Sequence, residues 1–379
     1  MSADVPLDGF AEPRFTAVRD RFAALLADGT ETGAAVCVYV GGEPVVDLWG
    51  GWADAARTRP WQRDTIVMTY SVTKVPAALS LLTLVDRGLV GLDDPVASVW
   101  PEYGVAGKES TTLRHLLAHQ AGLPAFPERR PAESWADWDD LAGMLARAAP
   151  QWEPGSAHAE HALTYGHLLG EVVRRVDGRS LGQVWREDVA APLGLDFQIG
   201  LTDEECARAA EVEYAVPSWP ADVGGAPGSL RERSVGNPAG ARDLAVLNSR
   251  LWRQSEVPAV NGHGTARAIA HLYAVLAGHR DEAVLSPGLR DAAFSAVAKG
   301  HDLMLERDVV WGLGVQLEDD YVGMGGLGGC DGLAETARGY AYGYVTRRLA
   351  DHERAIALSD TVEGILDVEK ADAEGAGRS

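Results

Sequence analysis

The sequence predicts an α+β fold in which an antiparallel sheet, built from both ends of the chain, is flanked by helices and carries a large helical insertion. Strand-like runs occur near the N-terminus and again after residue 300, whereas the patterns between them are mostly helical. No internal repeat divides the chain. We therefore expect a discontinuous sheet domain of residues 1–75 and 301–368, a mostly helical domain of residues 76–300 and a disordered tail of residues 369–379.

The first predicted elements are a helix and a β-hairpin. Residues 12–28 have the pattern of an amphipathic helix, which Gly29 ends. Two strand-like runs follow at residues 34–40 and 44–48, and the Gly41-Gly42-Glu43 segment between them is a hairpin signal.

The segment after this hairpin holds the most informative spacing in the chain. Ser71 and Lys74 lie three residues apart, so a helical turn would bring both side chains to one face. The apolar run from Ala77 to Val85 would bury that helix, and Gly88 is a suitable C-cap. The helix dipole and the amine both favour a deprotonated serine oxygen, and the lysine can accept the proton if burial lowers its pKa. This spacing therefore suggests a nucleophilic serine.

A second serine competes for the role of nucleophile. Ser180 lies in a Gly-x-Ser-x-Gly pattern, which occurs once, as does the Ser-x-x-Lys pattern at Ser71. A nucleophile elbow needs a strand before the serine and a buried helix after it. Ser180 instead follows a helix-like run and an Asp177-Gly178 turn, so we interpret it as a helix N-cap. Ser71 has the same structural alternative, an N-cap above a core helix.

The middle of the chain has helical patterns separated by loops rich in proline, glycine and tryptophan. Helices are predicted at residues 112–119, 138–149, 163–176, 240–251 and 264–278. Residues 217–240 show no periodicity and are predicted to form a long loop, a common location for binding residues. Trp219 in this loop is the tryptophan that we expect to form a wall of the substrate site.

Strand patterns return near the C-terminus. They are predicted at residues 309–318, 320–326 and 339–347, and a final helix is predicted at about residues 350–368. Tyr342 and Tyr344 alternate along the last strand, which favours sheet packing over a chemical role.

The composition excludes several classes of partner. The chain of 379 residues is 46% apolar and can bury a large core, while its net charge of −21 argues against nucleic acids and anionic membranes. No apolar run is long enough to span a bilayer and no secretory signal is visible, so the expected location is the cytoplasm. Cys37, Cys206 and Cys330 are widely spaced and suggest neither disulfides nor a metal site, and Cys330 is expected to be structural.

The Ser-x-x-Lys helix, the strands before it and a late glycine-rich strand together resemble the serine β-lactamase and penicillin-binding-protein superfamily. The resemblance is strongest to class C β-lactamases and their carboxylesterase and transacylase relatives, and it covers most of the chain. It rests on the segments GEPVVDLWGG, TYSVTK, GLDDPVASVWPEY, LRHLLAHQAGLP, WEPGS, WGLGV and GGLGG. This resemblance implies a β-lactamase-like fold.

The resemblance also implies roles for individual residues. Ser71 would be the acylated nucleophile and Lys74 its proton partner, with Tyr70 beside them in the substrate site. The backbone N–H groups of Ser71 and Leu327 would form the oxyanion hole, and such donors do not depend on the identity of the side chain.

Two side-chain motifs of the family are altered in this chain. Counting from Pro154-Gly155-Ser156, Glu160 falls where the family has a tyrosine, and Tyr165 is an alternative five residues later. Glu160 could act as a base, as a glutamate does in class A β-lactamases, or could be a solvated loop residue.

The late Lys-Thr-Gly or His-Thr-Gly motif is the second that differs. Its positions are held by Met324-Gly325-Gly326, which we expect to line the substrate site. The cation that binds a carboxylate beside the scissile bond is thereby lost. Penicillin hydrolysis is therefore disfavoured, and neutral esters or amides fit better.

Four histidines are candidates for chemical roles. His115 and His119 have the spacing of a helical metal pair, but no third ligand accompanies them, so we predict a structural role and no metal. His158 and His161 flank Glu160 and are candidates to enter the site.

The sequence leads to two functional hypotheses. The first is a serine acyl-enzyme catalyst that passes an acyl group from a small ester or amide to water or to a small amine or alcohol. Such an enzyme would be an esterase or a biosynthetic transacylase of the kind used to make natural products such as antibiotics. The second is a non-catalytic binding protein that retains the fold. No cofactor is implied, and the sequence does not indicate an oligomeric state.

Overall fold

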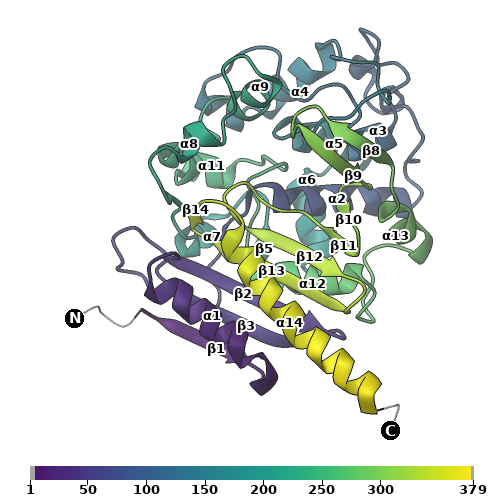
Figure 1. Ribbon diagram of the computed structural model, residues 1–379. Coiled ribbons are helices and arrows are strands. Elements are labelled where there is room, and N and C mark those ends of the chain that lie inside the picture. The colour runs from purple at the N-terminus through teal and green to yellow at the C-terminus, as the bar shows by residue number, and fades with distance from the viewer. Residues whose placement is uncertain (1–4, 377–379) are drawn as a thin grey trace.

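The structure is a computed structural model that describes residues 5–376. Its main feature is a nine-stranded sheet whose strands come from both ends of the chain, which confirms the predicted architecture (Figure 1). All neighbouring strands in this sheet are antiparallel. In spatial order they are β1 (Leu7–Ala11), β3 (Glu43–Gly51), β2 (Gly33–Val40), β13 (Tyr340–Thr346), β12 (Asp331–Glu335), β11 (Tyr321–Gly323), β10 (Gln316–Glu318), β9 (Arg307–Trp311) and β8 (Ala298–Asp302).

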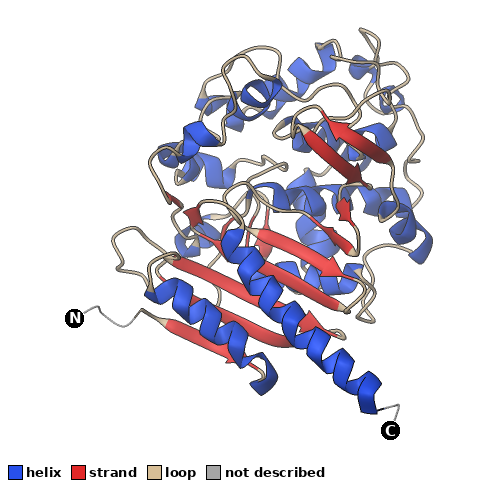
Figure 2. Ribbon diagram, viewed as in Figure 1, coloured by secondary structure: helices blue, strands red, loops and turns tan. Residues whose placement is uncertain are grey.

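Two terminal helices cover one face of the sheet. Alternate side chains of β2 and β13, such as Val36 and its partner Tyr344, pack against α1 (Thr16–Ala27) and α14 (Glu353–Ala376). Figure 2 shows these two helices side by side across the strands. Burial of one complete face explains why the strands show a clear period of two.

The opposite face of the same strands packs against α12 (Ala266–Leu276) and joins the larger core, which includes Cys37 and Ala341. At Gly343 the helix backbone approaches so closely that a Cβ would lie 2.3 Å from the carbonyl oxygen of Ala266. α12 therefore covers the sheet, although its residues fall in the range 76–300 predicted for the helical domain.

The predicted hairpin joins β2 to β3. Gly41 and Gly42 have φ angles of 56° and 85°, the left-handed values that a tight two-residue turn needs and that glycine adopts without strain. The hairpin signal in the sequence therefore corresponded to a real turn.

The C-terminal helix is longer than predicted. α14 continues to Ala376, so residues 369–376, which we expected to be disordered, are helical, while residues 377–379 lie outside the described part of the chain. Alanine, glutamate and lysine dominate this end, and such residues favour a helix even where no core packing is available. The charged composition suggested disorder, but it also suits an exposed helix.

Most of the remaining helices lie above the long strands in the view of Figure 1, in the part of the molecule that also holds β8 and β9. The central helix is α2 (Lys74–Asp86), which packs against α5 (Thr164–Asp177). The others are α3 (Leu113–Leu117), α4 (Trp138–Arg147), α6 (Leu181–Val184), α7 (Asp203–Arg208), α8 (Trp219–Asp222), α9 (Leu230–Gly236), α10 (Leu244–Leu247), α11 (Arg250–Gln254) and α13 (Pro287–Ala293). Short strands are β4 (Val67–Met68), β5 (Phe197–Gln198), β6 (Glu213–Tyr214), β7 (His263–Gly264) and β14 (Arg348–Leu349).

Some segments differ from the sequence prediction. The sequence did not suggest β1, β8 or β12, whose residues include glycines and charges that obscure an alternating pattern. The predicted loop at residues 217–240 contains the short helices α8 and α9, the second of which is capped by the Ser229 side chain. Within residues 5–376, no helix combines the length and apolar content needed to cross a bilayer.

Candidate active site

Ser71 lies in a single turn of 3₁₀ helix, Tyr70–Thr73, between β4 and the start of α2. Its side chain makes no capping hydrogen bond, so the N-cap alternative for Ser71 does not describe this structure. Tyr70 has a φ of 47°, an unusual value for a residue with a Cβ, and its buried hydroxyl donates to the carbonyl oxygen of Ala241 at 3.1 Å. The strained residue directly before Ser71 is thus fixed by its own side chain.

Ser71, Lys74 and Glu160 meet at one point. The Lys74 Nζ atom lies 2.8 Å from Ser71 Oγ and 3.1 Å from Glu160 Oε1. Ser71 Oγ lies 3.3 Å from the same Glu160 oxygen. The three polar groups therefore form a closed triangle through which a proton can pass in either direction.

The surroundings of Lys74 favour its neutral form. The side chain is fully buried, and its Nζ also donates to the carbonyl oxygens of Ala162 at 3.1 Å and Ala259 at 3.2 Å. Burial lowers the pKa of Lys74, and the neighbouring Glu160 opposes this shift. When both N–H groups of a neutral amine point at these carbonyls, its lone pair is left to accept the Ser71 proton.

The glycine-rich turn after β11 lies against the nucleophile segment. A Cβ on Gly326 would lie 2.1 Å from the carbonyl oxygen of Thr69, so only glycine permits this approach. The turn is closed by bonds from Gly326 N to Cys330 O at 2.8 Å and from Gly329 N to Gly326 O at 3.0 Å. The N–H of Leu327 has no hydrogen-bond partner among residues 5–376, so it is free to bind a substrate oxygen.

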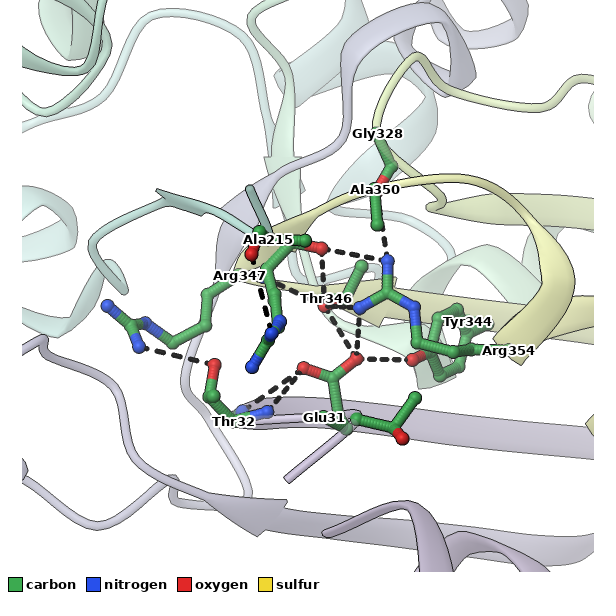
Figure 3. Close-up of polar contacts among 12 residues, drawn as sticks. Glu31, Thr32, Ala215, Gly328, Tyr344, Thr346, Arg347, Ala350 and Arg354 are labelled. Atoms are coloured by element: carbon green, nitrogen blue, oxygen red, sulfur yellow. Dashed lines mark hydrogen bonds and ion pairs between the residues drawn. The ribbon is translucent and has the colours of Figure 1, made fainter. Parts of the chain in front are cut away.

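A buried polar network holds this turn from behind (Figure 3). The carbonyl oxygen of Gly328 accepts hydrogen bonds from Ala350 N at 3.0 Å and from Arg354 Nη2 at 3.3 Å. Arg354 in turn pairs with Glu31, whose Oε2 also accepts from the Tyr344 hydroxyl at 2.6 Å. The network ties the turn to β13 and to the residues that precede β2.

Ser71 and Glu160 open into a cavity of about 630 Å³. Its walls are mostly apolar, and the apolar side chains come from widely separated segments: Leu163, Val235, Val260, Met304, Trp311 and Met324. Tyr70, Gly325 and Leu327 also line it, as predicted, whereas Gly326 contributes only its close approach to Thr69.

Comparison with known proteins shows the family to which the chain belongs. A family model described as beta-lactamase matches residues 18–363. The chain belongs to the β-lactamase family. The esterase/β-lactamase LipL of Mycobacterium tuberculosis is 31% identical over 359 residues, which are 90% of this chain and 83% of LipL.

Two solved structures support this membership. A family VIII carboxylesterase is 35% identical, has a TM-score of 0.87 and is aligned over 95% of this chain and 100% of its own. A penicillin-binding-protein homologue from Caulobacter crescentus is 36% identical, with a TM-score of 0.83 and the same coverage. The chain is therefore an enzyme of the serine hydrolase and acyltransferase type, similar to β-lactamase-like esterases.

Two residues predicted to contact substrate do not line the cavity of this β-lactamase-family protein. Tyr165 is fully buried on α5, where its hydroxyl donates to the carbonyl oxygen of Leu117 at 3.3 Å. Trp219 is also buried and stacks on Tyr214, with ring centres 5.6 Å apart, while its edge lies against Tyr70. Trp219 thus supports Tyr70 from behind instead of forming a substrate wall.

The histidines beside Glu160 also lie outside the cavity. His161 Nδ1 donates to Ala159 O at 2.8 Å and its Nε2 accepts from Leu123 N at 3.1 Å, while burial lowers its pKa to about 4. His158 Nε2 lies 3.3 Å from the carbonyl oxygen of Gly300. Both hold the backbone around Glu160.

The other residues singled out in the sequence have structural contacts. His115 takes part in the capping box of α3, and His119 is buried against the Tyr165 and Trp311 rings. Within residues 5–376, no group of three or more histidine, cysteine, aspartate or glutamate side chains could hold a metal ion. Cys330 is buried, and burial raises the pKa of its thiol to about 12, which keeps it unreactive. Ser180 caps α6, as predicted, and donates to Glu256 Oε1 at 2.5 Å.

Several cavity residues could not be recognised in the sequence. Met304 comes from the β8–β9 hairpin, Val235 from α9 and His352 from the residue before α14. None belongs to a local pattern, because only the tertiary fold brings these segments together. A strand prediction at residues 298–302 would have placed the hairpin near the site, but that segment has no clear alternation.

Proposed function

We propose that this protein is a serine carboxylesterase that forms an acyl-enzyme at Ser71 and passes the acyl group to water or to a small alcohol or amine. The observation that carries the proposal is the triangle of Ser71, Lys74 and Glu160, with all three sides at 3.3 Å or less. Similarity to an esterase/β-lactamase and to a family VIII carboxylesterase supports an ester as the acyl donor.

In the acylation step, Ser71 Oγ attacks the ester carbonyl carbon while Lys74 takes the serine proton. The carbonyl oxygen becomes an oxyanion, which the N–H groups of Ser71 and Leu327 stabilise by two hydrogen bonds. The carbon–oxygen bond to the leaving alcohol then breaks, and the proton passes to that alcohol. Burial lowers the pKa of Lys74, and its Nζ lies 2.8 Å from Ser71 Oγ. Both observations support Lys74 as the base that takes the serine proton.

In the second step we assign Glu160 the role that a tyrosine has in related enzymes. Its carboxylate accepts a proton from the incoming water or alcohol, directly or through Lys74, as the acceptor attacks the acyl-enzyme. The ester bond to Ser71 breaks, and Ser71 regains its proton. The contact of Glu160 with both other groups supports a shuttle of this kind.

The mostly apolar walls of the cavity favour an acyl group with an apolar chain. Met324 stands where the family has a lysine or histidine, so no cation there is aimed at a substrate carboxylate. This supports esters over penicillins as substrates. A cavity of about 630 Å³ also has room for an acceptor beside a short acyl group, which is why we include acyl transfer in the proposal.

Intact-protein mass spectrometry with a fluorophosphonate and with p-nitrophenyl acetate tests the proposal. We expect one covalent adduct, which peptide mapping assigns to Ser71, and none on the Ser71→Ala variant. The absence of an adduct with both reagents, in a folded protein, would refute an acyl-enzyme at Ser71. Product analysis with an added alcohol then measures how much acyl group goes to transfer and how much to hydrolysis.

A further inference from the structure

The cavity that contains Ser71 continues toward α14 and reaches two polar side chains, Asp331 and His352. Asp331 is the first residue of β12, and His352 directly precedes α14. The neighbouring Gly332 faces Ile269 and Tyr273 of α12, so the alternation of the strand directs Asp331 to the other face, toward α14. Both side chains therefore belong to the same cavity as the nucleophile.

Gly325 leaves an open position between these two side chains. A Cβ on Gly325 would lie 3.0 Å from His352 Nε2 and 3.8 Å from Asp331 Oδ1. The related enzymes have a threonine at this place in the late motif, whereas this chain has no side chain there. A small polar group of a ligand can therefore occupy the position and contact both Asp331 and His352.

Both polar groups can accept further hydrogen bonds. The Asp331 Oδ1 atom accepts a bond from the adjacent Gly332 N at 2.9 Å, and its carboxylate has no ion pair among residues 5–376. The His352 Nε2 atom is buried without a hydrogen-bond partner in the same described range. Two charged groups act on the Asp331 carboxylate, the basic His352 and the acidic Glu318, and Glu318 itself pairs with Arg307 at 3.3 Å. The Asp331 carboxylate is half-buried and pairs with no lysine or arginine among residues 5–376, so a cationic ligand would add a favourable charge interaction there.

We propose that Asp331 and His352 form a subsite for a primary ammonium group on the acyl part of the ester substrate. This rests on the proposed function above and names a substrate class for it. The ammonium N–H groups donate to the Asp331 carboxylate and to the free Nε2 of His352. Met324 stands where the family's lysine or histidine would place a cation next to Gly325, and a substrate carboxylate at the same position would face Asp331 at close range.

A ladder of p-nitrophenyl esters tests this subsite. Each ω-ammonio acyl ester is compared with the ester in which a methyl group replaces the ammonium, and chain lengths that cyclise to lactams are left out. We expect wild type to prefer the ammonium ester at one or more lengths by about tenfold or more in kcat/KM. Equal kcat/KM for both members of every pair would overturn the proposal, and this result needs no variant.

Two variants then separate a specific site from a general negative potential. Asp331→Asn keeps the shape but removes the charge, and we expect it to bring the ammonium-to-methyl ratio to within about threefold of one. Asp360→Asn removes a carboxylate from α14 that lines the same cavity, and the ratio should stay near the wild-type value. An equal loss in both variants, or a preference that survives Asp331→Asn, would contradict a site at Asp331.

Failure of the subsite can be distinguished from failure of the acyl-enzyme proposal. If the proposed function fails, no adduct forms at Ser71 and neither ester of a pair is turned over. If only the subsite fails, the methyl esters are hydrolysed and label Ser71, but the ammonium gives no advantage.

Discussion

Arg354 and Glu31 form a buried ion pair behind the glycine-rich turn, with Arg354 Nη1 2.8 Å from Glu31 Oε2. The pair joins the start of α14 to the residues that precede β2, which are far apart in the sequence (Figure 3). Because the other guanidinium nitrogen of Arg354 donates to Gly328 O, the same pair also fixes the turn that presents the Leu327 N–H. The ion pair thus connects the stability of the fold to the geometry of the oxyanion hole.

Replacing Arg354 should therefore reduce both stability and rate. Arg354→Met leaves the Glu31 carboxylate buried without its cation, which typically costs about 3–5 kcal/mol. The turn loses one of the two donors to Gly328 O, so we expect kcat for p-nitrophenyl acetate to fall by about tenfold or more. Urea unfolding and steady-state kinetics on the same preparation measure the two effects.

Arg347 provides a matched control for this variant. Its side chain is equally buried and pairs with Glu213 at 2.9 Å, but it makes no hydrogen bond to the turn of residues 326–329. Because the Glu213 side chain is 27% exposed and can be solvated, Arg347→Met should lose less stability than Arg354→Met and keep kcat within about threefold. A similar fall in kcat in both variants would mean that lost stability, and not the turn, explains the effect. Partial recovery of kcat in Arg354→Lys would favour loss of the hydrogen bond to the turn as the explanation.

The sequence predicted those parts of the fold that local patterns determine. The helix of residues 16–27 and the hairpin at Gly41-Gly42 followed from helical periodicity and from the glycine requirement of a tight turn. The spacing of Ser71 and Lys74 was equally local, because one turn of helix brings them together. Glu160 came from counting along a family motif, and its side chain does reach both groups.

Contacts between distant segments could not be predicted in the same way. Trp219 lies in a segment without periodicity, which favoured a place in the substrate wall, but its large apolar ring packs against Tyr70 instead of facing the cavity. Tyr165 lies on the buried face of α5, which the helical pattern alone could not distinguish from a face toward the site. Asp331 and His352 belong to different elements and meet only because α14 crosses the end of β12.

Ser71→Ala and Ser180→Ala test the choice of nucleophile. Ser71→Ala should abolish both the covalent adduct and esterase activity. Ser180→Ala removes a cap and the contact with Glu256, so we expect a loss of about 1 kcal/mol in the free energy of unfolding and a kcat within a few-fold of wild type. Thermal melts and ester kinetics check both expectations. The reverse pattern, with Ser180→Ala folded but inactive, would assign the nucleophile to Ser180.

Tyr165→Phe tests whether Tyr165 is structural, as its buried position on α5 indicates, or contacts the substrate, as the sequence suggested. The substitution removes one buried hydrogen bond, to the carbonyl oxygen of Leu117, and leaves the ring in place. We expect a cost of about 0.5–1.5 kcal/mol in the free energy of unfolding and a kcat/KM within about threefold of wild type. A large fall in kcat/KM without a loss of stability would show that the Tyr165 hydroxyl takes part in the reaction despite its position.

The role of Glu160 can be read from the pH dependence of kcat/KM in wild type, Glu160→Gln and Glu160→Tyr. The active enzyme needs a neutral Lys74, so the rate rises with pH through the pKa of this amine. Because the Glu160 charge opposes the lowering of that pKa by burial, Glu160→Gln should move the acidic limb to lower pH.

The same substitution should also lower the rate on the plateau, because an amide cannot take up the proton of the acceptor. The expected loss is about 10²–10⁴-fold, the usual contribution of general acid–base catalysis. The buried His161 has a pKa of about 4, so it is neutral at neutral pH and does not produce the acidic limb of the profile. Glu160→Tyr restores the side chain of the related enzymes and should recover part of the activity lost in Glu160→Gln. If Glu160→Gln instead stays within about threefold of wild type between about pH 6 and pH 9, while Lys74→Met is severely impaired, Lys74 alone handles the protons.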